Sequence, residues 1–178
     1  MIRKKNIRWF ILILPLFYAG FSHAQNPVKK TYAYTRDFIP GMVKVKMKPG
    51  GEMIKEKPVI KTTWFFFLEG NIDTAILSVR AIWIKKKRYS IDKCKTINTP
   101  FTVFGSENNV KEKIELVPLT SQKVIQVWPG LLSSKQYRSK SLARLISLNE
   151  LVVEFASHEK VFYAQVKKIT VLPPVEEL

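Results

Sequence analysis

The sequence predicts an all-β protein, an antiparallel β-sandwich of the immunoglobulin-like or a related type, with one short covering helix. Three observations support this class. Apolar and polar residues alternate more often than they follow helical spacing, the alternating segments are rich in Val, Ile, Phe and Tyr, and Gly, Pro, Asn and Ser clusters separate them. Short β-rich segments at this spacing favour a sandwich or barrel, of which we expect the sandwich.

Residues 1–24 have the three parts of a secretory signal peptide. Four basic residues precede an apolar run from Trp9 to about Phe21, and small residues then lead to a cleavage point between Ala24 and Gln25. An uncleaved membrane anchor is the alternative, but the run is shorter than the roughly 20 residues that cross a bilayer. No cysteine stands at the cleavage point, which argues against a lipoprotein. We therefore expect export, with no transmembrane segment after cleavage.

One folded domain is expected after the leader. Residues 25–172 are enough for a single self-sufficient core, and we expect one β-sandwich domain there. Residues 173–178 are expected to form a flexible C-terminal tail, because Pro173 and Pro174 cannot extend a sheet.

Three segments in the first half of this domain are strand candidates. In residues 42–48, "MVKVKMK", Val43, Val45 and Met47 alternate with lysines, which is typical of a strand with one buried face. Residues 59–70, "VIKTTWFFFLEG", are apolar on both faces from Trp64 to Leu68 and predict a central strand. The segment "AILSVRAIWI" alternates at first and becomes apolar on both faces toward its end.

The second half contains further strand candidates and the helix. Residues 133–150 place Leu142, Leu145 and Ile146 on one helical face, so a short covering helix is expected. Turn-forming clusters include Pro129-Gly130. The strand candidates are, in order, "YSID", "PFTVFG", "KIELVPL", "KVIQVW", "ELVVEFA" and "KVFYAQVKKITVL".

Three hairpins are expected. Residues 120–122 would join "KIELVPL" to "KVIQVW", and residues 157–160 would join "ELVVEFA" to "KVFYAQV". In the third, residues 85–88 form the connection within "IWIKKKRYSIDKCK". Since this connection has no Gly or Asn, a tight two-residue turn would be strained, and we expect a longer loop or a bulge.

The chain is strongly basic. Its 30 Lys and Arg against 14 Asp and Glu give a net charge of +16, and removal of the leader, which carries four of the basic residues and no acidic one, leaves +12. Such a charge favours anionic envelope components as partners, whereas nucleic acid is not expected outside the cytoplasm. The alternative is a solubilising surface excess without a dedicated partner.

The hairpin of four consecutive cations is the best binding candidate. The candidate site consists of Trp83, Lys85, Lys86, Lys87, Arg88 and Tyr89. The alternative, which we favour, is a charged tip that projects into solvent and discourages strand-to-strand aggregation.

No catalytic, metal or cofactor site is predicted. His158 is the single histidine after the leader and is expected in an exposed turn, and Cys94, the single cysteine, is expected to be buried. Carboxylates are present, but none lies in a context that favours burial and a raised pKa, and no glycine-rich phosphate loop occurs.

The leader, the aromatic strand and the segments "AIWIKKKRYSI", "TPFTV" and "IELVPLTSQKVIQV" resemble small, uncharacterised secreted β-rich proteins of Bacteroidota bacteria, over about residues 60–170. This resemblance implies a location in the envelope of a Gram-negative cell. It implies no activity and no site residues.

Three functions are open at this point. The first is an exported, non-enzymatic binding or accessory module of the periplasm, the outer-membrane surface or the exterior. The second is an interaction subunit of an envelope assembly that docks through a sheet edge or through the face of "KVFYAQVKKITVL". The third, the least favoured, is a small cell-wall or glycan hydrolase that uses carboxylates or Cys94.

Overall fold

The computed structural model describes residues 26–41, 45–51, 53–55, 59–73, 75–107, 110–134 and 139–177. The predicted leader, residues 1–24, lies outside them. The described residues form thirteen strands and one helix. These are β1 (Val28–Pro40), β2 (Val45–Met47), β3 (Met53–Lys55), β4 (Lys61–Gly70), β5 (Ser78–Ile84), β6 (Lys87–Ile97), β7 (Phe101–Glu107), β8 (Val110–Val117), β9 (Lys123–Leu132), α1 (Lys140–Leu148), β10 (Leu151–Ser157), β11 (Lys160–Val166), β12 (Thr170–Val171) and β13 (Val175–Glu177).

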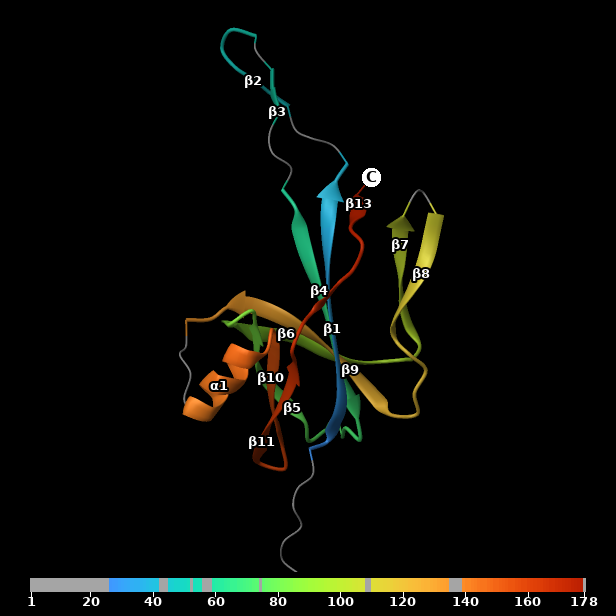
Figure 1. Ribbon diagram of the computed structural model, residues 1–178, viewed down its shortest axis with the longest axis vertical. Coiled ribbons are helices and arrows are strands. Elements are labelled where there is room, and N and C mark those ends of the chain that lie inside the picture. Colours follow the sequence, from blue (N-terminus) through green and yellow to red (C-terminus); the bar gives the residue numbers. More distant parts are fainter. Residues whose placement is uncertain are drawn as a thin grey trace, which may run out of the picture.

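Nine strands form one curled, mixed sheet (Figure 1). Its order is β11-β10-β5-β6-β9-β4-β1-β12, and β13 also pairs with β1. All neighbours are antiparallel except β12 and β13, which run parallel to β1. The predicted all-β class with one short helix is confirmed. The sandwich is not, because hydrogen bonding joins these strands into one continuous sheet.

The main core lies inside the curl. Ala33 of β1 and Ala164 of β11, from strands far apart in the sheet order, belong to one buried cluster with Phe66, Leu68 and Ile82. Apolar side chains that alternate along each strand therefore meet across the curl, and their removal from water favours this shape. The segment "WFFFL" lies in β4, between β9 and β1, as a central strand should.

Two elements cover the outer face of the sheet. The two-stranded sheet of β7 and β8 packs beside β1 and β4, where the Phe67 and Phe101 rings lie 5.1 Å apart. Arg36 of β1, which is 3% exposed, donates from Nη1 to the carbonyl oxygen of Phe104 at 2.6 Å. This bond ties β7 to the main sheet.

The helix α1 covers the other part of the outer face. Its N-cap, Ser139, accepts a hydrogen bond from the backbone N–H of Leu142 at 3.2 Å, which satisfies one of the free donors of the first turn. Leu142 and Ile146 are buried against Trp83 and Val152. The expected short covering helix is confirmed. Among the described residues, no helix has the length and apolar character that crossing a bilayer requires.

Two connections differ from the prediction. The expected hairpin around residues 120–122 is wrong, because β8 pairs with β7 whereas β9 inserts between β4 and β6. Pro129 and Gly130, expected in a turn, lie inside β9. The hairpin with His158 and Glu159 at its tip is confirmed as the connection of β10 and β11.

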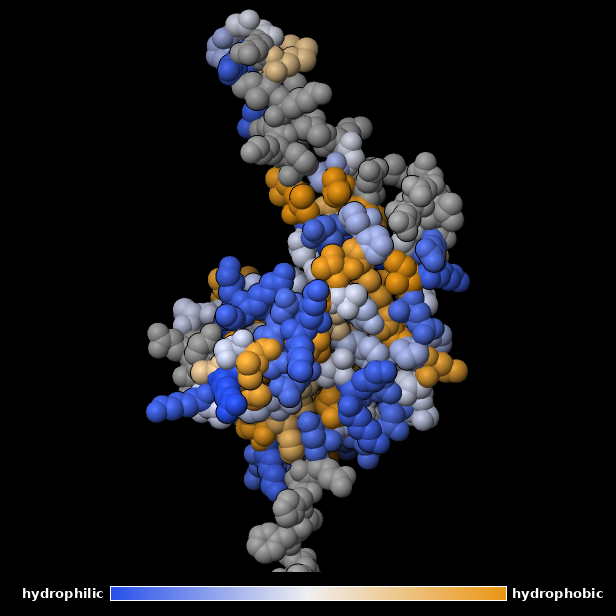
Figure 2. Space-filling view, in the orientation of Figure 1, coloured by the Kyte–Doolittle hydropathy of each residue, from blue (hydrophilic) through white to orange (hydrophobic). Residues whose placement is uncertain are grey.

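Strands β2 and β3 form a two-stranded arm that projects from the sheet (Figure 1). The predicted buried face is wrong at Met47, which is 72% exposed, while Val43 lies outside the described residues. The arm is a separate two-stranded sheet among the described residues, so the alternation of apolar side chains does not correspond to a buried face there. Figure 2 shows apolar surface at the base of this arm, where Val59 and Ile60 are exposed.

The C-terminal segment is not the flexible tail that Pro173 and Pro174 suggested. Val175, Glu176 and Glu177 pair in parallel with the last three residues of β1. The prolines interrupt the edge between β12 and β13 but do not end it, because pairing resumes after them.

Candidate functional site

The cationic hairpin has a tight two-residue turn. Ile84 pairs with Lys87, so that Lys85 and Lys86 alone form the connection, with φ of 46° and 70°. The expectation of a longer loop or bulge is therefore wrong. Both lysines adopt the left-handed conformation of a primed turn, which matches the twist of the flanking strands but costs a non-glycine residue roughly 1–2 kcal/mol.

Strand alternation sends the cations to opposite faces of the sheet. Lys87 and Tyr89 lie on the inner face, where Tyr89 packs against the main core. Arg88 lies on the outer face, with its guanidinium carbon 5.7 Å from the centre of the Trp83 ring and Nη1 donating to Ser133 Oγ at 2.8 Å. The prediction that all four charges project from the tip is therefore wrong for Arg88.

Trp83 belongs to the core and not to a binding surface. It is 3% exposed, and α1 covers it. Its indole Nε1 is buried and has no hydrogen-bond partner among the described residues. Trp83 and Arg88 are thus structural, and the structure leaves Lys85, Lys86, Lys87 and Tyr89 of the predicted site accessible.

A cleft opens where β9 separates from β4. Pairing of these strands ends at Phe66 and Val127, although β9 continues along β6 to Leu132. Pro129 has no N–H to donate, and the register of β6 and β9 shifts on either side of Ile91. Strand β9 therefore does not fill the space between the first half of β4 and the first residues of β6.

The cleft has a volume of about 520 Å³. This volume lies within the usual range for small-molecule sites, about 300–1,000 Å³. We call it the Lys85 cleft. Its lining residues come from β1, β4, the β5–β6 hairpin and β12, and they are Thr35, Asp37, Thr62, Trp64, Ile84, Lys85, Lys87, Tyr89 and Val171.

One wall of the Lys85 cleft consists of two cross-strand pairs. Thr35 of β1 is opposite Trp64 of β4, and Asp37 is opposite Thr62. The hydroxyl of Thr62 donates to Asp37 Oδ1 at 2.7 Å. Trp64 is half-buried and stacks on Phe66, with ring centres 5.9 Å apart and an interplanar angle of 25°. Packing thus holds the indole in place at the cleft.

A buried hydroxyl in this wall has no partner. Thr35 is 8% exposed, and its Oγ1 makes no hydrogen bond within the part of the chain that the structure describes. An unsatisfied buried polar group costs roughly 1–3 kcal/mol, so such groups are often found where a ligand or water binds.

The opposite wall is cationic and aromatic. Lys85, Lys87 and Tyr89 come from the β5–β6 hairpin, and both lysines are exposed. Neither ammonium group has an ion-pair partner among the described residues, although Asp37 lines the same cleft. The wall therefore presents two positive charges and a phenol ring to any bound molecule.

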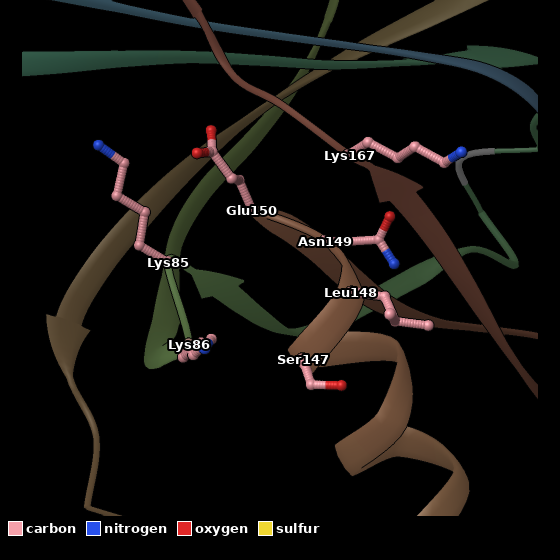
Figure 3. A pocket seen from close by; sticks show the side chains of 7 residues that line it. All are labelled: Lys85, Lys86, Ser147, Leu148, Asn149, Glu150 and Lys167. Atoms are coloured by element: carbon pink, nitrogen blue, oxygen red, sulfur yellow. The ribbon is translucent and has the colours of Figure 1, made fainter.

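A smaller cavity adjoins the Lys85 cleft and shares Lys85 with it (Figure 3). It has a volume of about 220 Å³ and is also lined by Lys86, Lys167 and Glu150. The Lys85 and Glu150 side chains extend in the same direction (Figure 3). Glu150 is already used in the fold, since its Oε2 accepts from the N–H of Ile169 at 2.7 Å. This cavity extends the basic surface beyond the cleft.

The other chemistry-bearing residues lie away from the cleft. His158 is in the exposed turn of β10 and β11, as predicted, with a φ of 48°. Cys94 was expected to be buried but is exposed on β6, and the pKa of its thiol is raised because neighbouring groups partly remove water from it. No group of three His, Cys, Asp or Glu side chains suited to a metal ion occurs in the described ranges.

Sequence reasoning found one wall of the cleft and missed the other. Alternation in "YTRDF" places Thr35 and Asp37 on one face, and alternation in "KTTWF" does the same for Thr62 and Trp64. No local signal shows that these two segments pair, or that β9 leaves them uncovered.

Comparisons with known proteins add no relative. No protein-family model, no curated protein and no solved structure matches this chain. The resemblance to secreted Bacteroidota proteins stays a prediction.

Proposed function

We propose that this protein is an exported, non-enzymatic binding module that holds an anionic envelope component in the Lys85 cleft. The observation that carries the proposal is the cleft itself. Two ammonium groups without an ion-pair partner among the described residues, those of Lys85 and Lys87, line it together with two half-buried aromatic rings, Trp64 and Tyr89. Cations without an internal partner are available for an external anion, and aromatic rings add contact area at low entropic cost.

Export and the envelope location rest on the predicted leader and on the resemblance. The overall charge of the mature chain, +12, would raise the association rate with an anionic surface. The cleft would then provide the specific contact. Catalysis is not part of the proposal.

The test compares the loss of two cleft charges with the loss of two charges elsewhere. Binding of purified lipopolysaccharide and of an acidic polysaccharide is measured by titration calorimetry on the mature chain. We expect K85S/K87S to bind at least one of them about tenfold or more weakly than the parent, because each charge-assisted hydrogen bond contributes about 1.5–3 kcal/mol.

The matched control is K123S/K140S, in which two exposed lysines outside the cleft are replaced. It removes the same charge and should change the affinity by less than about threefold at moderate salt. Equal losses in both double variants would mean that net charge alone drives the binding, which would contradict a dedicated cleft.

The second candidate is an interaction subunit of an envelope assembly. Strand β11 supports it, because β11 ends the path of hydrogen-bonded strands and, among the described strands, pairs with β10 alone. A partner strand could add to this edge. Affinity purification of the parent and of a Val161→Pro variant would test it: a partner retained equally by both would not be bound through this edge.

A further inference from the structure

We infer that the ligand of the Lys85 cleft is an acidic saccharide, a sugar ring that carries a carboxylate or phosphate substituent beside free hydroxyls. This inference rests on the proposed function and makes its ligand class specific. It is based on the polar groups of the wall formed by β1 and β4. The positive charge of the β5–β6 hairpin alone would suit any anion.

The aromatic residues suit a sugar ring. Trp64 is held by its stack on Phe66, and Tyr89 by packing against the main core. The C–H groups on one face of a pyranose carry partial positive charge and pack favourably on the negative face of an aromatic ring. Because both side chains are already ordered, little rotamer entropy is lost when a ring binds.

The hydroxyl of Thr35 needs a partner that a sugar can supply. Its Oγ1 is buried without a hydrogen bond in the described structure, beside the Trp64 with which Thr35 pairs. Directly opposite residues of an antiparallel pair have Cβ atoms about 4.5–5.5 Å apart. A ring stacked on Trp64 would therefore lie beside Thr35, whose Oγ1 is closed to solvent in this structure and would turn toward the cleft to bond a sugar hydroxyl.

Asp37 adds an acceptor for sugar hydroxyls. Thr62 donates to its Oδ1, and its second carboxylate oxygen, Oδ2, is a further acceptor. A carboxylate in a cationic cleft repels ligands that are anionic throughout, such as a polyphosphate. It favours a molecule that places one anionic group at Lys85 and Lys87 and hydroxyls at Asp37.

The apolar part of the lining is too small for an acyl chain. Besides the two aromatic rings, only Ile84 and Val171 are apolar, and Ile84 is 2% exposed. The lining thus favours a polar ring over the hydrocarbon of an anionic lipid. Phospholipid binding is accordingly an outcome that the experiment must separate from saccharide binding.

Four probes are titrated into the mature chain: a uronic-acid oligosaccharide, a hexose phosphate, a neutral oligosaccharide of equal length, and vesicles of phosphatidylglycerol. We expect the uronate or the hexose phosphate to bind at least tenfold more tightly than the neutral sugar. Whichever of these two acidic probes binds identifies the anionic group of the ligand as a carboxylate or a phosphate. Binding should also change the fluorescence of the parent, and a Trp64→Phe variant should lose most of this change.

The decisive variant is Thr35→Val, which keeps the shape of the side chain and removes its hydroxyl. We expect saccharide affinity to fall about five- to tenfold, while the unfolding midpoint stays equal or rises, because an unsatisfied buried group has been removed. A purely structural role of Thr35 would leave the affinity unchanged and would overturn its assignment as a ligand contact.

Two further results would overturn the inference in distinguishable ways. If the vesicles bind with dependence on Lys85 and Lys87 and neither acidic sugar does, the saccharide class is wrong while the proposed function stands. If none of the anionic probes binds at low salt, the proposed function fails together with the inference.

Discussion

Gly130 shows how a single residue fixes the path of β9. A Cβ at this position would lie 2.6 Å from Ser90 Oγ and 3.2 Å from the backbone nitrogen of Asp92. The Ser90 oxygen also accepts from the N–H of Leu131 at 3.0 Å, so it is not free to move away. The close approach of β9 to β6, and with it the separation from β4 that opens the cleft, therefore requires glycine.

We expect Gly130→Ala to lower the free energy of unfolding by about 1–3 kcal/mol, because backbone or side-chain atoms must shift to admit the methyl group. Urea denaturation followed by far-UV circular dichroism measures the change. The control is Leu131→Ala, since Leu131 is 83% exposed, and its effect should lie within about 0.5 kcal/mol. Equal stability of Gly130→Ala and the parent would show that the strands tolerate a wider spacing.

Glu69 joins β4 to the β8–β9 connection at the end of β4 away from the cleft. Its Oε2 accepts from the Tyr32 hydroxyl at 2.6 Å, and its Oε1 from the Thr120 hydroxyl at 2.7 Å. These bonds hold the pKa of the Glu69 carboxyl below its ordinary value, and the bond from Tyr32 has the larger effect. Partial burial opposes them. The ionised form is thus the one that stabilises the fold.

We therefore expect the stability difference between the parent and Glu69→Gln to depend on pH. A depressed folded-state pKa gives a stabilisation that is complete above the unfolded-state value, about 4.3, and is lost as the pH falls through the folded-state pKa. Urea midpoints measured from pH 7 to pH 3 should converge at the acid end. Midpoints that stay a constant distance apart would show that the charge of Glu69 has no part in the effect.

At the scale of elements, the sequence predicted most strands, but of their partners only those joined by a short turn, β5 with β6 and β10 with β11. The double-sided apolar run in β4 and the helical face of Leu142 and Ile146 are local patterns, and both elements formed as expected. The choice of β7 as the partner of β8 depends on contacts between distant segments, such as Phe67 with Phe101, which no local pattern contains.

The candidate site was half predictable for the same reason. The basic run marked Lys85 and Lys87, but strand pairing decides that Arg88 and Trp83 face the helix instead. The turn was mispredicted because glycine is preferred there but not obligatory. Two hairpins place non-glycine residues at both positive-φ positions, Lys85-Lys86 and His158-Glu159.

These two hairpins carry a matched prediction. Lys86→Gly and Glu159→Gly should each raise the unfolding free energy by about 1 kcal/mol, because glycine accepts φ of 70° and 65° without steric cost. Thermal unfolding should then shift upward by about 2–4 °C. The control is Lys160→Gly, which lies in β11 and should destabilise the protein. If neither turn variant gains stability, the lysine and glutamate side chains must stabilise their turns by as much as the strain costs.

At the scale of the whole molecule, the curl brings the first described strand and one of the last to the cleft. Thr35 pairs with Trp64 on one side and with Val171 of β12 on the other. The cleft thus includes residues from the first strand and from one of the last. Its shape depends on the parallel edge that β12 and β13 add to β1, and the N–H of Leu172 donates to the carbonyl oxygen of Thr35 at 2.8 Å at this edge.

Removal of residues 175–178 tests whether this edge stabilises the whole fold. The deletion eliminates the pairing of β13 with Phe38, Ile39 and Pro40 of β1. Each backbone hydrogen bond contributes about 0.5–1.5 kcal/mol, so we expect a loss of about 1–3 kcal/mol and a lower unfolding temperature. Deletion of Leu178 alone, which leaves β13 complete, is the control and should change little. An unchanged unfolding temperature in the longer deletion would show that residues 175–178 are dispensable, and the edge of β1 would then be held by β12 alone.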